Sequence, residues 1–205
     1  RIMGGITNSA CFEIGNTVEA ESTSGFSFIN CDAELGNGIN NVGWRMGKIG
    51  GGIDDISQIS WIGCTAWGPE GSQGIPGQIG WHNAGHNTLQ LTWVGGGGLF
   101  CNTLVKTDAG GSQYFFSFGG GHNNIDFHLN SNNNFLIDGG RFEVGKTFVK
   151  SDNADGGLSL SVTNVQLGNY APPNGRIFDI DRASYLFIDG LNMEDGNAKG
   201  AQTFY

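Results

Sequence analysis

The chain has 205 residues and a net charge of −9, and only 14% of its residues are charged. The negative net charge argues against direct binding to nucleic acid or acidic lipid. The sequence contains no run of 18 apolar residues, so a membrane-spanning helix is not predicted. Apolar residues make up 38%, including 14 Phe and 5 Trp, which excludes a disordered chain. This length and composition predict one domain over residues 1–205 with a sizeable core.

Short blocks recur along the chain, each with an apolar or small residue, then Glu or Gln, usually an apolar residue, and Gly. The clear blocks are CFEIG (11–15), DAELG (32–36), RFEVG (141–145), NVQLG (164–168) and NMEDG (192–196), with weaker candidates CTAWG (64–68), TWVGG (92–96) and SFGGG (117–121). Neighbouring clear blocks lie 21, 23 and 28 residues apart (12 to 33, 142 to 165, 165 to 193). Such a recurrence without helical periodicity is typical of a β-solenoid, and the 37 Gly and 21 Asn suit its short strands and tight turns. The sequence therefore predicts an all-β fold.

Strand alternation then divides each block into inward and outward positions. The predicted inward column is Phe12, Ala33, Phe142, Val165 and Met193, and the predicted outward column is Glu13, Glu34, Glu143, Gln166 and Glu194. Glu13 and Glu34 would stack as like charges on neighbouring rungs. Such a pair can be catalytic or bind calcium, or it can be a solvated ladder whose side chains splay apart, and we favour the ladder.

The four cysteines are predicted to be reduced fillers. Cys11 and Cys64 hold the same place in their blocks but lie two rungs, or about 9–10 Å, apart, too far for a disulfide. Cys31 lies one position off that column. Metal-ligand spacing of Cys and His is absent, since His82 and His86 flank a turn, so neither a metal nor a cofactor is predicted.

All five tryptophans fall within residues 44–93. Trp67 and Trp93 lie at or near inward block positions and are assigned to the core. Trp44 and Trp81 lie in the glycine-rich segments NVGWRMG and QIGWHNAGHN, where an exposed indole can stack on a sugar ring. The predicted carbohydrate-binding residues are therefore Trp44, Trp81, Arg45, Asn83 and His86. The alternative is that these rings fill a wider rung.

Two later segments carry candidate catalytic groups. In IDFHL (125–129), alternation leaves Asp126 and His128 outside, and in FDID (178–181) it leaves Asp179 and Asp181 outside. The intervening rung contributes Lys150 and Asp152 at a corresponding place. Two carboxylates are the minimum set for glycoside cleavage, so Asp126, His128, Asp152, Asp179 and Asp181 form a candidate catalytic groove. The alternative is a solvated outer face.

The segment GGRFEVGKTF (139–148) matches the spacing of a phosphate-binding P-loop. That motif works only as a turn from a strand into a helix. The residues after Thr147 show no helical periodicity and are interrupted by Asp155-Gly156-Gly157. A nucleotide site is therefore not predicted.

Three segments, FSFINCDAELGNG, NFLIDGGRFEVG and YLFIDGLNMEDG, resemble rungs of the pectate-lyase-like right-handed parallel β-helices, which are frequent in bacteriophage tailspikes. The resemblance implies a right-handed parallel β-helix (β-solenoid) of about eight rungs. It also implies a homotrimer among other virion proteins that binds, and in many cases cleaves, a bacterial surface polysaccharide.

The calcium site of true pectate lyases is not recognisable, so no family site is carried over, and whether the chain is an enzyme stays open. The alternatives are a purely structural solenoid of a virion or cell surface, and a secreted polysaccharide lyase or hydrolase. A start at Arg1-Ile2, without an initiator Met or signal stretch, suggests a fragment of a longer virion or extracellular chain.

Overall fold

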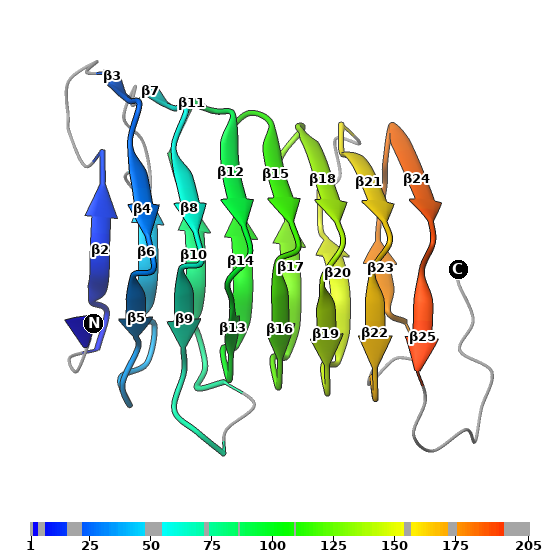
Figure 1. The fold of residues 1–205 in the computed structure, drawn as a ribbon, viewed down its shortest axis with the longest axis horizontal. Helices are drawn as coiled ribbons and strands as arrows, with labels where there is room; N and C mark the ends of the chain where they lie inside the picture. Colours follow the sequence, from blue (N-terminus) through cyan, green and yellow to red (C-terminus); the bar gives the residue numbers. More distant parts are fainter. Residues whose placement is uncertain are drawn as a thin grey trace.

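The computed structural model describes residues 2–3, 7–15, 22–47, 55–71, 74–85, 87–108, 110–153, 157–171 and 176–194. Within these residues every regular element is a β-strand, and the strands pair in parallel to form four sheets (Figure 1). The described part of the chain contains no helix of the length and apolarity needed to cross a membrane. The prediction of an all-β fold is confirmed.

The four sheets are named A to D. Sheet A has the order β1 (Ile2–Met3), β5 (Asp32–Glu34), β9 (Thr65–Trp67), β13 (Gly97–Leu99), β16 (Gly119–Gly121), β19 (Arg141–Glu143), β22 (Gln166–Gly168), β25 (Asn192–Glu194). Sheet B has the order β2 (Ala10–Ile14), β6 (Val42–Met46), β10 (Ile79–Asn83), β14 (Thr103–Thr107), β17 (Ile125–Leu129), β20 (Thr147–Ser151), β23 (Phe178–Ile180). Sheet C has the order β11 (Asn87–Leu89), β7 (Asp55–Ser57), β3 (Ser22–Ser24). Sheet D has the order β24 (Tyr185–Asp189), β21 (Ser159–Thr163), β18 (Asn134–Asp138), β15 (Gln113–Phe116), β12 (Leu91–Val94), β8 (Ser60–Ile62), β4 (Ser27–Ile29).

The chain visits these sheets in a fixed cycle. After each strand of sheet D it enters sheet A, then sheet B, and returns to sheet D beside the strand it left, so successive turns lie side by side along the molecule (Figure 1). Sheet C adds one further strand to each of three early turns. We call one passage through sheets D, A and B a rung. Parallel sheets stacked in this way are consistent with a β-solenoid. Thr147 begins the strand β20 rather than a helix, which agrees with the exclusion of a P-loop.

The corner between sheets D and A shows one use of Gly and Asn in this chain. The residue after every sheet D strand adopts a left-handed conformation, with φ between 50° and 72°; these residues are Asn30, Gly63, Gly95, Ser117, Gly139, Asn164 and Gly190. Glycine has no Cβ to clash there, and asparagine tolerates this conformation better than most residues. The corner is therefore made by a column of turn-forming residues, one per rung.

Three inward columns contribute to the core, together with buried residues beside them and at the corners. Sheet B contributes Phe12, Trp44, Trp81, Val105, Phe127, Val149 and Phe178, and sheet D contributes Phe28, Trp61, Trp93, Phe115, Ile137, Val162 and Ile188. Sheet A contributes Ala33, Ala66, Gly98, Gly120, Phe142, Leu167 and Met193. Rings on neighbouring rungs stack face to face: the centroids of Phe12 and Trp44 are 3.8 Å apart, and those of Trp61 and Trp93 are 4.7 Å apart.

The predicted columns are partly wrong. Ala33, Phe142 and Met193 do share one inward column, but Phe12 lies on sheet B, and Leu167 takes the place predicted for Val165. Outside, Glu34, Glu143 and Glu194 share a column of sheet A, although not on neighbouring rungs. Glu13 lies on sheet B, and Gln166 stacks on Arg141. The predicted Glu13–Glu34 pair therefore does not exist, because 21 residues are less than the 32-residue step from Phe12 to its partner Trp44 (12 to 44).

All four cysteines are free thiols, as predicted, but their placement differs from the prediction. Cys11 does not lie in one column with Cys64, because Cys11 is in β2 of sheet B and Cys64 directly precedes β9 of sheet A. Instead Cys31 and Cys64 precede the paired residues Asp32 and Thr65 on neighbouring rungs, and the Cys31 backbone N–H donates to Cys64 Sγ over 3.5 Å.

This register predicts that oxidised glutathione can convert Cys31 and Cys64 into a disulfide with each other. Neighbouring strands lie about 4.8 Å apart, inside the Cα range of about 4.4–6.8 Å that a disulfide needs. Burial raises the pKa of the Cys64 thiol, against the hydrogen bond from the Cys31 backbone N–H, so the reaction should be slow at neutral pH and faster at pH 9. Peptide mass spectrometry should find the Cys31–Cys64 link, and Cys31→Ser should abolish it while Cys11→Ser does not. A Cys11–Cys64 link in the folded protein would contradict the register.

Candidate functional site

The predicted carbohydrate-binding rings are buried. Trp44 and Trp81 are both 0% exposed, because they are inward residues of sheet B whose rings lie parallel at 6.5 Å. Their predicted exposure is therefore wrong, and the alternative that they fill a wide rung is confirmed. Asn83 is also buried, Arg45 faces outward and pairs with Glu13 at 3.4 Å, and His86 lies outside the described residues.

Asp126, predicted to lie on the outer face, is buried as well. It is 1% exposed, and its carboxylate accepts hydrogen bonds from Asn123 at 2.9 Å and from the Tyr170 hydroxyl. Alternation fails here because the second residue of sheet B strands packs inward at the corner, as its buried neighbours Leu104 and Phe148 also do. Burial raises the pKa of Asp126 to about 7, against the opposing hydrogen bonds.

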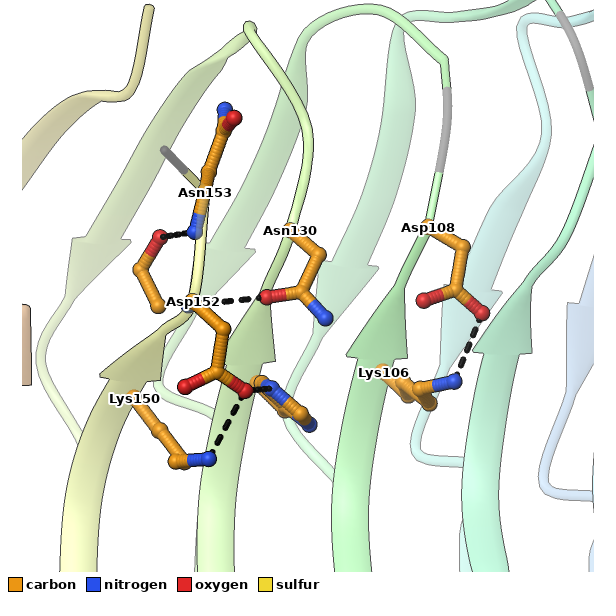
Figure 2. A network of polar contacts seen from close by, with 8 residues as sticks. Lys106, Asp108, Asn130, Lys150, Asp152 and Asn153 are labelled. Atoms are coloured by element: carbon orange, nitrogen blue, oxygen red, sulfur yellow. Dashed lines mark hydrogen bonds and ion pairs between the residues drawn. The ribbon is translucent and has the colours of Figure 1, made fainter. Parts of the chain in front are cut away.

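Three predicted catalytic residues, His128, Asp152 and Asp179, do lie near one another at the outer face of sheet B. Lys150 lies between them, because the register places His128, Lys150 and Asp179 next to one another on successive rungs. Asp152 Oδ2 lies 2.7 Å from Lys150 Nζ and 3.0 Å from His128 Nε2 (Figure 2). Asp179 pairs with Arg176 at 3.1 Å, and the fifth predicted residue, Asp181, is exposed on the following turn.

The electrostatics of this group, His128, Lys150 and Asp152, favour a neutral imidazole beside an ionised carboxylate. Burial lowers the pKa of His128, although its hydrogen bond and attraction to Asp152 oppose the shift. The hydrogen bond from Lys150 lowers the pKa of Asp152, and His128 adds to this effect. At neutral pH Asp152 is therefore a poor proton donor, whereas His128 can accept a proton.

The same arrangement occurs two rungs earlier and was missed from the sequence. His82 Nε2 and Lys106 Nζ each lie 2.7 Å from Asp108 Oδ2, and His82 stacks on Lys106 as His128 does on Lys150. Burial alone would raise the pKa of Asp108, but the bonds to His82 and Lys106 hold it well below its usual range. The signal was available, since Lys-Thr-Asp (106–108) and Lys-Ser-Asp (150–152) share one pattern.

Trp67, assigned to the core, is instead an outward residue. It is 39% exposed, because Ala66 is the inward residue of β9, and its Nε1–H donates to Thr65 Oγ1 over 2.6 Å. Its ring borders a groove of about 610 Å³ at the corner between sheets A and B, lined by Glu34, Gly36, Asn37, Trp67, Gly68, Pro69, Glu70, Leu99 and Phe100. A second hollow of about 260 Å³, with a glycine-rich lining, adjoins the same indole.

No family model, curated protein or solved structure matches this chain. Among the described residues, no three His, Cys, Asp or Glu side chains gather closely enough to hold a metal ion.

The buried Asp126 carboxyl predicts a fall in stability with rising pH. Its folded-state pKa of about 7 exceeds the usual 3.8, so between about pH 4 and pH 7 the unfolded chain releases a proton that the folded protein keeps. The free energy of unfolding should fall across this window because of Asp126 and level off above it. Asp126→Asn should remove this contribution. The free energy of unfolding of the variant, measured with urea, should therefore rise relative to that of the wild type between pH 4 and pH 8. Equal pH slopes for the two proteins would contradict the assignment.

Proposed function

We propose that this protein recognises a bacterial surface polysaccharide in the Trp67 groove, as a right-handed parallel β-helix of the tailspike type. The observation that carries the proposal is the exposure of one tryptophan. Trp67 is 39% exposed and borders a groove, whereas the other four tryptophans are at most 1% exposed.

The chemistry of the groove suits a sugar ring. A flat indole covers the apolar C–H face of a pyranose, and its N–H is already held by Thr65, which fixes the ring plane. Glu34, Glu70 and Asn37 line the same groove and offer hydrogen-bonding groups to hydroxyls. Small residues beside the ring, among them Gly97 and Gly119, leave the neighbouring surface open to a chain that continues past it.

The outer face of sheet D supports self-association, which we propose to be a homotrimer that stands in a virion with other structural proteins. Ile29, Ile62 and Val94 stack on successive rungs and are 59%, 40% and 42% exposed. Such an apolar column favours burial against another protein surface. Sedimentation equilibrium tests the trimer, and a stable monomer would contradict it.

Replacing Trp67 by Ala should weaken polysaccharide binding by about 1–3 kcal/mol, the scale of covering a large apolar side chain. Thermal stability should change little, because the ring is exposed. Binding is measured by a glycan array of bacterial surface polysaccharides followed by calorimetry on the best ligand.

Two control variants accompany this test. Leu89→Ala removes another exposed apolar side chain (47%), on sheet C, and should leave binding unchanged. Trp81→Ala should lose about 3–5 kcal/mol of stability as a buried aromatic. If wild-type protein binds no polysaccharide, or Trp67→Ala binds as tightly as Leu89→Ala, the alternative of a purely structural solenoid gains.

A second candidate function, cleavage of the polysaccharide, is favoured by the 3.0 Å contact between His128 Nε2 and Asp152. The ionised Asp152 can hold the imidazole in one tautomer, and Lys150 can attract the carboxylate of a uronic acid. This set suits β-elimination: His128 takes the proton next to the uronate carboxylate, a carbon–carbon double bond forms, and the bond to the linked sugar oxygen breaks, with a proton going to that oxygen. Hydrolysis with Asp152 as the acid fits less well, because its pKa is lowered.

His128→Gln should abolish any such cleavage, measured by the absorbance of the new double bond on a uronic-acid polysaccharide. Since burial lowers the pKa of His128, wild-type activity should be at its plateau at neutral pH and fall only as the pH drops through that lowered pKa. Binding in the Trp67 groove should survive this change. Full cleavage by His128→Gln would contradict the role of the imidazole.

A further inference from the structure

A third, mainly polar pocket lies at the corner where sheet B strands end and the chain turns toward sheet D. It has a volume of about 300 Å³ and is lined by Asp108, Gly110, Asn130, Ser131, Asn132, Asn133 and Asn153. Asp108, Asn130 and Asp152 hold the same position on three successive rungs, two residues after Lys106, His128 and Lys150 (Figure 2). The register of sheet B therefore builds this pocket from three rungs.

One hydroxyl of the pocket lining, that of Ser131, is buried without a hydrogen-bond partner among the described residues. Ser131 is only 6% exposed, and its Oγ has no hydrogen-bond partner among the described residues. Buried polar groups are almost always paired in native proteins, by protein, water or ligand. The Ser131 Oγ is itself shielded from solvent, so a ligand in the pocket completes its hydrogen bonding only when the serine side chain rotates toward that ligand.

The charge in the pocket is already balanced. The Asp108 carboxylate is paired with Lys106 and His82 at 2.7 Å each. Asn130 Oδ1 accepts a hydrogen bond from the Asp152 backbone N–H at 3.1 Å, which fixes the amide plane. Balanced charge and an excess of amides disfavour a bare cation, which needs several uncompensated oxygens, and also an anion, which Asp108 would repel.

We infer that this polar pocket binds a neutral, hydroxyl-rich ligand, namely a single sugar residue. A sugar hydroxyl both donates and accepts hydrogen bonds, and the pocket offers both: carboxylate and serine oxygens accept, and asparagine amides and the serine hydroxyl donate. Recognition here is directional, in contrast to the indole surface of the Trp67 groove. The inference shares its ligand class with the proposed function, but it rests on different residues.

The test is a titration of the ¹⁵N-labelled protein with the methyl glycosides of glucose, galactose, mannose, rhamnose and N-acetylglucosamine. At least one should shift the side-chain amide signals of Asn130, Asn132 and Asn153 in a saturable manner. Calcium chloride and glucuronate are titrated in parallel. If no glycoside shifts these signals, or only calcium or glucuronate does, the inference is overturned.

Two variants probe the chemistry of the polar pocket. Ser131→Ala removes only the unpartnered hydroxyl and should weaken glycoside binding about fivefold without loss of stability. Asn130→Asp keeps an oxygen for the Asp152 N–H but replaces an amide donor by a charge, so it should abolish glycoside binding. The matched control, Asn134→Asp, lies on sheet D outside the lining and should bind normally. Unchanged binding in both Ser131→Ala and Asn130→Asp would overturn the inference.

Trp67→Ala in the same titration separates this inference from the proposed function. Glycoside shifts that persist in Trp67→Ala, and vanish in Asn130→Asp, support the polar pocket whether or not the groove binds. Polysaccharide binding that is lost in Trp67→Ala while no pocket signal ever moves supports the groove and overturns the pocket.

Discussion

Every rung of this molecule stacks on the next at the strand spacing of about 4.8 Å, and this stacking fixes the cross-section that the inward side chains have to fill. Where sheet A provides Ala33, the other two sheets provide Phe28 and Trp44, and where it provides Ala66, they provide Trp61 and Trp81. Where sheet A provides Phe142, its rung has Ile137 and Val149. A Cβ on Gly98 would collide with the backbone oxygen of Ala66 and would lie 2.6 Å from the Leu104 side chain, so no larger residue fits there. The clustering of the four buried tryptophans within residues 44–93 is thus a volume balance across the core.

The same constraint shapes the outer surface. Glycine in β13 and β16 keeps sheet A thin where the core is crowded, and it also removes outward side chains from the surface beside Trp67. On sheet B, alternation sends one residue per rung outward, which gives the column Glu13, Arg45, His82, Lys106, His128, Lys150 and Asp179. The basic groups of this column stay close together because the carboxylates of Glu13, Asp108 and Asp152 pair with them, while Arg176 pairs with Asp179.

The strand period and turn chemistry could be predicted from the sequence, but the register could not. Alternation correctly placed Phe127, His128 and Leu129, since these are the last three residues of a five-residue strand and lie beyond its corner. It failed at Asp126, where the sheet B strand leaves a corner and two consecutive residues pack inward. Rung lengths also vary, because sheet C strands lengthen early rungs; a short block motif then cannot tell one sheet from the next. Trp67 was misassigned for this reason, as its burial depends on whether residue 66 or 67 is aligned with Ala33.

The two candidate binding places lie at opposite ends of the sheet B strands: the Trp67 groove lies before these strands begin, and the polar pocket lies where they end. A five-residue strand spans about 17 Å, so a ligand that touches both must be several sugar units long and must cross the outward column of sheet B. That column is an unusual surface for such a crossing, because Asp108 and Asp152 each hold a His and a Lys in place. A saccharide there meets fixed hydrogen-bonding groups whose charges are largely compensated. Contacts along it would therefore add geometric selectivity more than long-range attraction, which is consistent with the acidic net charge of the whole chain.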